Sequence, residues 1–270
     1  MSQRYDLSDL LELMARLRDP KDGCPWDLKQ SFSTIVPHTL EEAYEVADCI
    51  EQQDYDHLKG ELGDLLFQVI FYAQLGKEEN RFDFDQIVDT LVTKLIRRHP
   101  HVFPMGTLES RASEQALDDD AIKSRWEEIK QEERSEQARH RVLDDVPRAL
   151  PALNRAAKLQ KRAAQVGFDW PDLHGVLDKI EEEIGELREA VDRGAQADIA
   201  DETGDLLFAL VNLARHLRVN PDSALRATNQ KFERRFNHVE DQVEARGGDW
   251  QKFNLEQLDL SWDEAKEKGL

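Results

Sequence analysis

Two acidic motifs each occur twice in this sequence, at the same spacing. The segment Glu41–Glu45 (EEAYE) matches Glu182–Glu186 (EEIGE), and Glu61–Phe67 (ELGDLLF) matches Glu202–Phe208 (ETGDLLF). The offset is 141 residues for both pairs, since 183 − 42 and 202 − 61 give the same number. A shared offset at two separate motifs is typical of an internal repeat whose unit is a whole domain. The chain is therefore expected to fold as two copies of one architecture.

Two more segments recur in the same order further along each copy. Lys94–Arg98 matches Lys231–Arg235, and Trp126–Lys130 matches Trp262–Lys266, with small changes in offset. Glycines and prolines separate long stretches of helical periodicity, and alternating β-branched runs are absent. These patterns predict an all-α fold of two tandem homologous helical domains. We expect an N-terminal domain over residues 1–145, including a linker from about residue 104, and a C-terminal domain over residues 146–270.

Two apolar segments predict helices that are buried on most sides. In Leu58–Ala73, leucines at helical spacing are joined by Phe67, Ile70 and Phe71 on other faces, and Leu206–Leu217 has the same character. A helix that is apolar nearly all round is typical of a protein interior. We therefore expect these two helices at the centres of the two domains.

The carboxylates of each copy are predicted to gather on a helical hairpin. Glu42 and Glu45 are three residues apart and share one helix face, and Glu61 and Asp64 do the same on the next helix. A short connection around residues 53–56 would turn the second helix back along the first. The N-terminal copy then brings four carboxylates together. The C-terminal copy does the same with Glu183, Glu186, Glu202 and Asp205.

The second acidic pair of each copy is expected in an apolar setting. Asp64 and Asp205 directly precede a Leu-Leu-Phe run, which places them in the opening turns of helices expected to be buried. An unpaired buried carboxylate costs several kcal/mol, and neighbouring like charges add to that cost. A cation is the simplest compensation, and an all-oxygen set suits Mg²⁺, with Mn²⁺ as a substitute, rather than zinc. The alternative is a solvated acidic helix face, which is the ordinary role of such pairs.

Basic residues supply the other half of a phosphate site. Lys231 and Arg235 are four residues apart on a predicted helix. Arginine binds phosphate oxygens in bidentate fashion and lysine offers a point charge, although a salt-bridged helix face is the alternative. Trp262 and Lys266 form a similar pair near the end of the sequence. The indole would either stack on a nucleotide base or cover the core.

The bulk composition narrows the function classes. The net charge of −20 argues against a protein that grips nucleic acid or anionic lipid through phosphates, because both need clustered Lys and Arg. It leaves open a phosphate ligand bridged by a divalent cation. Cys24 and Cys49 form no zinc motif, and neither a signal peptide nor a transmembrane run is visible. We expect a cytoplasmic protein with no nucleic-acid or membrane partner.

The acidic motifs together resemble the EExxE…ExxD signature of the MazG family of all-α nucleotide pyrophosphohydrolases. The resemblance covers almost the whole chain and looks like the two-domain bacterial form. It includes the segments Gly23–Asp27, Gly60–Asp64, Arg97–Phe103 and Lys231–Arg235. It implies Mg²⁺-dependent cleavage of a nucleoside triphosphate between the α and β phosphates, giving the monophosphate and pyrophosphate. It also implies helical domains that pair into bundle-like homodimers.

The resemblance assigns roles by position. It implies metal ligands at Glu183, Glu186, Glu202 and Asp205, with Glu42, Glu45, Glu61 and Asp64 as a second, N-terminal set. It implies nucleotide contacts at Lys179, Lys231, Arg235, Trp262 and Lys266. Two positions depart from the pattern: Asp198–Asp201 replaces a basic residue that some relatives carry, and His38 stands where the C-terminal copy has Lys179. In two-domain members of the family the C-terminal domain is usually taken as the catalyst, so the resemblance implies that the C-terminal copy is the working one.

The expected mechanism uses metal held by the C-terminal carboxylates, with Glu182 as a further carboxylate that could activate the attacking water. Lys179, Lys231 and Arg235 would stabilise the leaving pyrophosphate. Two alternatives stand beside this hypothesis. One is a non-catalytic helical module that binds a nucleotide or a partner. The other is a narrower pyrophosphohydrolase acting on dUTP, dCTP or phosphoribosyl-ATP. Base and sugar preference, metal count and physiological role stay open.

Overall fold

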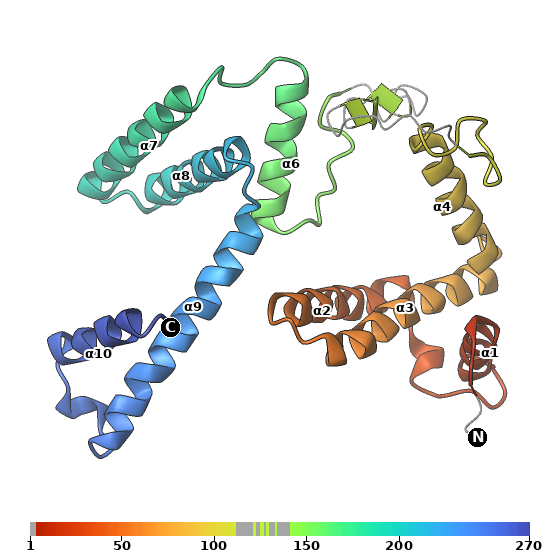
Figure 1. Cartoon of the computed structure of the whole chain (residues 1–270), viewed down its shortest axis with the longest axis horizontal. Helices are drawn as coiled ribbons and strands as arrows, with labels where there is room; N and C mark the ends of the chain where they lie inside the picture. Colours follow the sequence, from red (N-terminus) through yellow and green to blue (C-terminus); the bar gives the residue numbers. More distant parts are fainter. Residues whose placement is uncertain (1–3, 112–120, 123–124, 127, 130–132, 134–140) are drawn as a thin grey trace. The chain divides into compact units, whose positions relative to one another are not determined.

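The computed structural model describes residues 4–111, 121–122, 125–126, 128–129, 133 and 141–270 (Figure 1). All regular secondary structure within those residues is helical, which confirms the predicted all-α class. None of the described helices is long and apolar enough to cross a membrane. The chain divides into two compact units, Met1–Glu133 and Arg134–Leu270. The domain boundary near residue 145 stays a prediction, and much of the expected linker, residues 112–120 among it, lies outside the described residues.

The first unit contains helices with side-chain caps at their starts. Aspartate or serine at each N-cap accepts hydrogen bonds from backbone N–H groups of the first turn, which otherwise lack partners. The caps are Asp6, Ser31, Asp54 and Asp83. The helices are α1 (Leu7–Leu17), α2 (Phe32–Glu51), α3 (Tyr55–Glu78) and α4 (Phe84–Arg98), with a short 3₁₀ turn at Asp27–Lys29.

The hairpin predicted for the N-terminal copy is formed by α2 and α3. The connection is only three residues long, and Gln53 adopts a left-handed conformation (φ 59°) that reverses the chain. Because Asp54 caps α3, the helix begins at Tyr55, and Asp64 lies nine residues into it. The expectation that Asp64 lies in an opening turn was wrong for this reason. Asp205 lies nine residues into its own helix in the same way.

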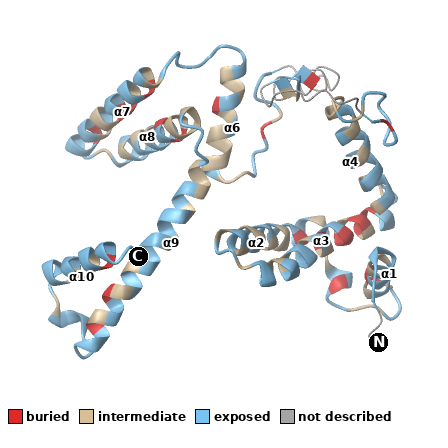
Figure 2. Ribbon diagram, in the orientation of Figure 1, coloured by how far each residue is buried: buried red, intermediate tan, exposed pale blue. Residues whose placement is uncertain are grey.

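The core of the first unit lies around the C-terminal half of α3. Met14, Ile35, Ile70, Phe71 and Leu75 form one buried cluster from α1, α2 and α3. Figure 2 shows the buried residues of α3 concentrated in that half of the helix. The N-terminal half contains none of the buried residues of α3, and Leu62 and Leu66 there stay 50% and 40% exposed. The prediction of a helix buried on most sides was therefore wrong for this half.

The second unit contains two helical hairpins. Helices α7 (Leu173–Arg193) and α8 (Gln196–His216) are joined at Gly194, whose left-handed φ of 67° suits a residue without a Cβ. Val176, Ile180 and Ala209 form the core between them. The apolar side chains of Leu207 and Phe208 remain about half exposed, so the expectation of burial was wrong for α8 as well. The other helices are α6 (Ala152–Gln165), α9 (Pro221–Ala245) and α10 (Leu255–Glu267), with a 3₁₀ turn at Trp250–Lys252.

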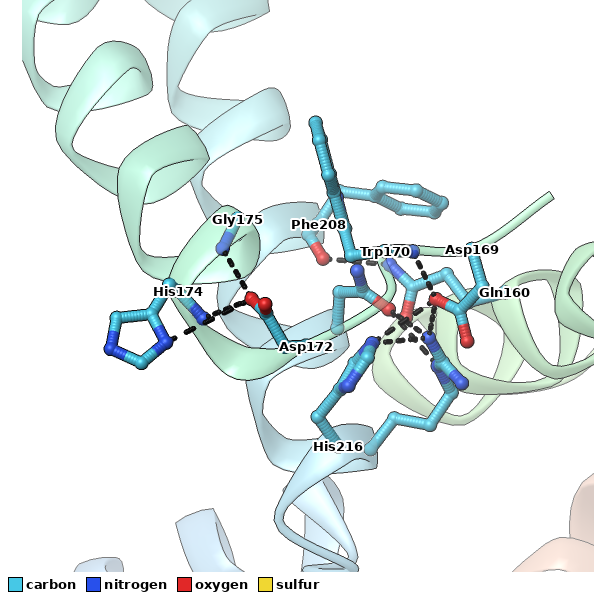
Figure 3. Close-up of polar contacts among 10 residues, drawn as sticks. Gln160, Asp169, Trp170, Asp172, His174, Gly175, Phe208 and His216 are labelled. Carbon is cyan, nitrogen blue, oxygen red and sulfur yellow. Dashed lines mark hydrogen bonds and ion pairs between the residues drawn. The ribbon is translucent and has the colours of Figure 1, made fainter.

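A polar network anchors the loop before α7 to the end of α8 (Figure 3). Asp169 accepts a hydrogen bond from Arg215, and the Nε2 atom of His216 lies 3.1 Å from the Asp169 Oδ1 atom. Burial alone would raise the pKa of Asp169, but the hydrogen bonds from Arg215 and His216 outweigh it and lower that pKa. Trp170 covers Gly175 so closely that an added Cβ would lie 2.8 Å from the indole. These contacts fix where α7 begins.

A buried arginine joins α1 to α3 in the first unit. The guanidinium of Arg18 donates to both carboxylate oxygens of Glu78, at 2.9 Å and 2.6 Å, and only 8% of Arg18 is exposed. The hydrogen bonds from Arg18 lower the pKa of Glu78. Removing one partner of a fully buried pair costs about 3–5 kcal/mol. Because the Glu78 side chain keeps a third of its surface exposed, a smaller cost applies here.

Glu78→Gln is expected to lower the free energy of unfolding by about 1–2 kcal/mol at neutral pH. The lowered pKa means that the wild-type contribution is present above the unfolded-state pKa, about 4.3, and is lost as the pH falls through the folded-state value. Urea unfolding of both proteins from pH 7 to pH 3 measures this difference. The gap between them should close toward acid pH, and a gap that is constant over that range would contradict the assignment.

Candidate functional site

Three carboxylates of the C-terminal copy come together between α7 and α8. Glu183 and Glu186 lie one turn apart on α7, and Glu202 faces them from α8. One carboxylate oxygen from each of them lies within 4.8 Å of the other two. The three acids differ in burial, since Glu183 is buried, Glu202 is half-buried and Glu186 is exposed. Such a set of oxygens can hold a divalent cation.

Glu183 has one carboxylate oxygen without a hydrogen-bonding partner. Only 4% of the residue is exposed, and its Oε2 atom is buried with no hydrogen bond from the described residues. Its Oε1 atom lies 2.8 Å from the Nζ atom of Lys179, which also donates to Glu182 at 2.9 Å. Hydrogen bonds to Glu183 and then Glu182 raise the pKa of Lys179. Burying a carboxylate oxygen without a hydrogen-bonding partner costs free energy. A ligand bound at this atom would therefore stabilise the folded protein.

The electrostatics of the cluster favour a cation. Burial raises the pKa of Glu202, and repulsion from Glu186, Glu183 and Asp205 raises it further. Asp205 is thus close enough to act on Glu202, although it lies outside the set of three oxygens that meet within 4.8 Å. Of the four acids expected to converge, three do so and the exposed Asp205 flanks them.

The N-terminal copy repeats the acidic cluster without its lysine. Glu42, Glu45 and Glu61 each place a carboxylate oxygen within 4.8 Å of the others. Burial first, and then repulsion from Asp64 and Glu45, raise the pKa of Glu42. His38 replaces the lysine, and its Nδ1 atom lies 3.6 Å from Glu41 rather than against Glu42. Among the described residues, no lysine forms an ion pair with Glu42, the equivalent of Glu183.

Four of the five predicted nucleotide contacts lie on another hairpin, and the fifth, Lys179, lies beside the acidic cluster on α7. Lys231 and Arg235 are on α9, and Trp262 and Lys266 are on α10, which packs against it. The Nε atom of Arg235 donates to the main-chain oxygen of Leu270 at 2.7 Å, and its guanidinium lies 5.8 Å from the centre of the Trp262 ring. No hydrogen bond or ion pair among the described residues connects these four side chains to the acidic cluster. The acidic cluster and these four predicted contacts therefore lie on two different hairpins.

An aromatic row on the α9–α10 hairpin was absent from our sequence analysis. Phe232 stacks on Phe236, whose ring in turn stacks on that of Trp250, with centroids 5.8 Å and 5.7 Å apart. At the other end Phe232 lies 5.1 Å from Trp262. The spacing of four between Phe232 and Phe236 was the available signal, because such pairs share a helix face. Trp262 is partly buried by these contacts.

Paired helices that present a carboxylate cluster, duplicated along one chain, define a class of all-α proteins equipped to bind divalent metal. The MazG nucleotide pyrophosphohydrolase domain model matches residues 30–103 and again residues 173–240. These matches cover both acidic clusters and more than half of the chain. The chain belongs to the MazG family.

Two curated relatives match this chain over nearly their whole length. A nucleoside triphosphate pyrophosphohydrolase of Escherichia coli K12 is 53% identical over 261 residues, which is 95% of each chain. A nucleoside triphosphate pyrophosphohydrolase/pyrophosphatase MazG of Thermotoga maritima is 42% identical, over 96% of this chain and 94% of the relative. The Bacillus subtilis protein YabN, described as uncharacterized, is 39% identical over 97% of this chain but only 52% of its own length. The similarity to the first two relatives therefore extends over nearly the whole chain.

Proposed function

We propose that the C-terminal copy hydrolyses nucleoside triphosphates to the monophosphate and pyrophosphate with Mg²⁺, which Mn²⁺ could replace. Membership of the MazG family and two similar pyrophosphohydrolases that match nearly end to end support the reaction class. The buried, unpartnered Oε2 atom of Glu183 supports the placement of the site. That atom lies in an all-oxygen donor set that fits a hard divalent cation.

The residues of the acidic cluster would have different roles in the reaction. Glu183, Glu186 and Glu202 would hold the metal, with Asp205 completing the set from α8. A bound Mg²⁺ supplies charge neutralisation for the phosphates and a more acidic water. Glu182, already hydrogen-bonded to Lys179, would orient the attacking water as a further carboxylate. Lys179 lies one turn before Glu183 and would stabilise charge on the phosphates once Glu183 turns to the cation.

The α9–α10 hairpin would supply nucleotide contacts. Lys231, Arg235 and Lys266 offer cations for phosphate oxygens, and Trp262 offers a face for the base. Lys266 is held 2.8 Å from Asp263 and Arg235 is held by Leu270, so both side chains are positioned rather than freely rotating. Binding would then require this hairpin and the acidic cluster to meet around one nucleotide.

We further propose a homodimer, in which a second copy of the chain covers the exposed apolar faces of the acidic hairpins. Leu62 and Leu66 on α3, and Leu207, Phe208 and Leu210 on α8, each keep at least 40% of their surface exposed. Exposed apolar side chains that form a patch mark an interaction surface. They lie on the helices that carry the second acidic pair of each copy, so dimerisation would shield the metal sites from water.

Leu207→Lys is expected to shift the dimer to monomer by placing a charge in the proposed interface. A buried charge without a partner costs several kcal/mol, enough to weaken association by about 10²-fold or more. Sedimentation velocity at several protein concentrations measures the change, with Leu255→Lys, at a more exposed leucine on α10, as the control. Wild-type protein that sediments as a monomer at high concentration would contradict the proposal.

A nucleotide panel tests the reaction itself. Pyrophosphate release from ribo- and deoxynucleoside triphosphates, with Mg²⁺ and with EDTA, is expected to be metal-dependent and to extend over several bases. Release confined to dUTP or dCTP would favour the narrower pyrophosphohydrolase. Binding without any release would favour a non-catalytic module. The proposed setting is the cytoplasm, where nucleotides are abundant and the free thiols of Cys24 and Cys49 stay reduced.

A further inference from the structure

The N-terminal copy holds its own carboxylate against the basic motif that corresponds to the proposed phosphate contacts. Arg98, the counterpart of Arg235, donates from Nη2 to the Oε2 atom of Glu133 at 2.5 Å and from Nε to its Oε1 atom at 3.3 Å. This is the bidentate geometry with which arginine binds phosphate. Both side chains are largely buried, with 29% of Arg98 and 17% of Glu133 exposed.

The surroundings of Glu133 are basic on one side. Hydrogen bonds from Arg98 lower the pKa of Glu133, and the charges of Arg98, Arg97 and Lys94 lower it further. The carboxylate therefore lies in the field of all three cations of the Lys94–Arg98 segment. Trp126 lies on the same stretch of chain as Glu133 and contacts His99, with ring centroids 5.1 Å apart. Trp126 and Glu133 thus each contact a residue at the end of α4.

The C-terminal copy lacks this carboxylate. Counting from the tryptophan that recurs, Glu133 lies seven residues after Trp126, and the residue seven after Trp262 is Gly269. Arg235 bonds a main-chain oxygen instead, and no ion pair of the described residues joins Lys231, Arg234 or Arg235 to an Asp or Glu side chain. One copy therefore holds a side-chain carboxylate against the arginine of its basic motif, and in the other copy no Asp or Glu side chain of the described residues takes that position.

We propose that Glu133 is an internal anion that occupies the phosphate-binding position of the N-terminal copy and prevents this copy from taking a nucleotide. The inference rests on the proposed function, because it assumes that the basic motif binds phosphate. A carboxylate tethered on the same unit competes at a high effective concentration, and the apparent affinity for a free ligand falls accordingly. Glu133 thereby determines which of the two copies binds substrate.

The test is the number of nucleotides bound per full-length chain. The probe is the α,β-methylene analogue of ATP with Mg²⁺, which cannot be cleaved at the proposed position, titrated by calorimetry. Wild-type protein should bind one analogue per chain, and Glu133→Gln should bind two, with affinity at the N-terminal copy raised about tenfold or more. Glu128→Gln is the matched control, since Glu128 lies on the same segment but pairs with exposed Arg125. Adding Arg98→Ala to Glu133→Gln should remove the second site.

Several results would overturn the proposal. Two sites in wild-type protein, no second site in either Glu133→Gln or Glu133→Ala, or an equal gain in Glu128→Gln would each do so. Thermal midpoints by circular dichroism establish that the variants are folded. Failure of the proposed function would give a different result from failure of this proposal. In that case wild-type protein would bind no analogue and release no pyrophosphate.

Discussion

Glu186→Gln is expected to lower kcat/KM for nucleoside triphosphate hydrolysis by about 10³-fold or more. The change removes one negative oxygen from the three that meet within 4.8 Å, and with it much of the affinity for the cation. A metal that offsets phosphate charge contributes several kcal/mol to transition-state stabilisation, and about 4 kcal/mol corresponds to 10³ in rate. Steady-state pyrophosphate release at saturating Mg²⁺ measures the loss. The fold should survive, because Glu186 is exposed.

Two further variants test whether the loss is specific to the acidic cluster and to the C-terminal copy. Glu181→Gln makes the same chemical change on an exposed position of α7 outside the cluster, and activity should stay within a factor of two to three of wild type. Glu45→Gln makes it at the corresponding position of the N-terminal copy (186 − 141 = 45) and asks which copy turns over. A folded Glu186→Gln protein with wild-type turnover would place the catalytic centre elsewhere. A large loss in Glu45→Gln alone would assign catalysis to the N-terminal copy.

Lys179→Met is expected to destabilise the metal-free protein by about 2–3 kcal/mol and to make its stability depend on Mg²⁺. The substitution leaves buried Glu183 without its lysine, and breaking a buried pair costs about 3–5 kcal/mol, less here because 36% of Lys179 is exposed. The pKa of Lys179 is raised, so its contribution is present below the unfolded-state pKa of about 10.4 and is complete throughout the neutral range. Urea unfolding in EDTA at pH 7 measures the loss.

Magnesium should restore most of that stability. A ligand at 100 times its dissociation constant stabilises the folded state by about 2.7 kcal/mol, and the cation would take over the neutralisation of Glu183. Wild-type protein should gain less from Mg²⁺ than Lys179→Met, because its lysine already offsets that charge. Lys252→Met, at an exposed lysine of the same unit, controls for the loss of a surface charge. Equal gains from Mg²⁺ in all three proteins would mean that Lys179 does not neutralise Glu183.

The helical hairpins could be predicted from the sequence because their signals are local. The period of apolar residues, the acidic pairs three residues apart and the short connections together predict two antiparallel helices and the shared face of Glu183 and Glu186. The structure confirms the all-α fold and brings three of the four expected acids of each copy together. Asp64 and Asp205 lie outside the sets of three converging carboxylates. The sequence could not predict this, because residue spacing gives the helix face of a side chain but not its rotamer.

Other features depend on contacts that no local pattern contains. Apolar residues all round a helix indicate burial, but they do not say whether the same chain covers them, and Leu62 and Leu207 are about half exposed. The ion pair of Lys179 with Glu183 was not part of the prediction, which placed Lys179 at the phosphates, and that role stays a prediction. The pairing of Arg98 with Glu133 spans 35 residues, so neither side chain alone predicted it. Lys130, expected to match Lys266, lies outside the described residues.

The most direct test of the metal site is anomalous diffraction from crystals of the full chain grown with Mn²⁺ and the α,β-methylene analogue of ATP. The prediction is a manganese peak at about 2.1–2.3 Å from carboxylate oxygens of Glu183, Glu186 and Glu202, bridged to the phosphates of the analogue. If manganese and the phosphates bind together at other side chains, and these three carboxylates lie in solvent without a shared cation, the proposed catalytic centre is wrong.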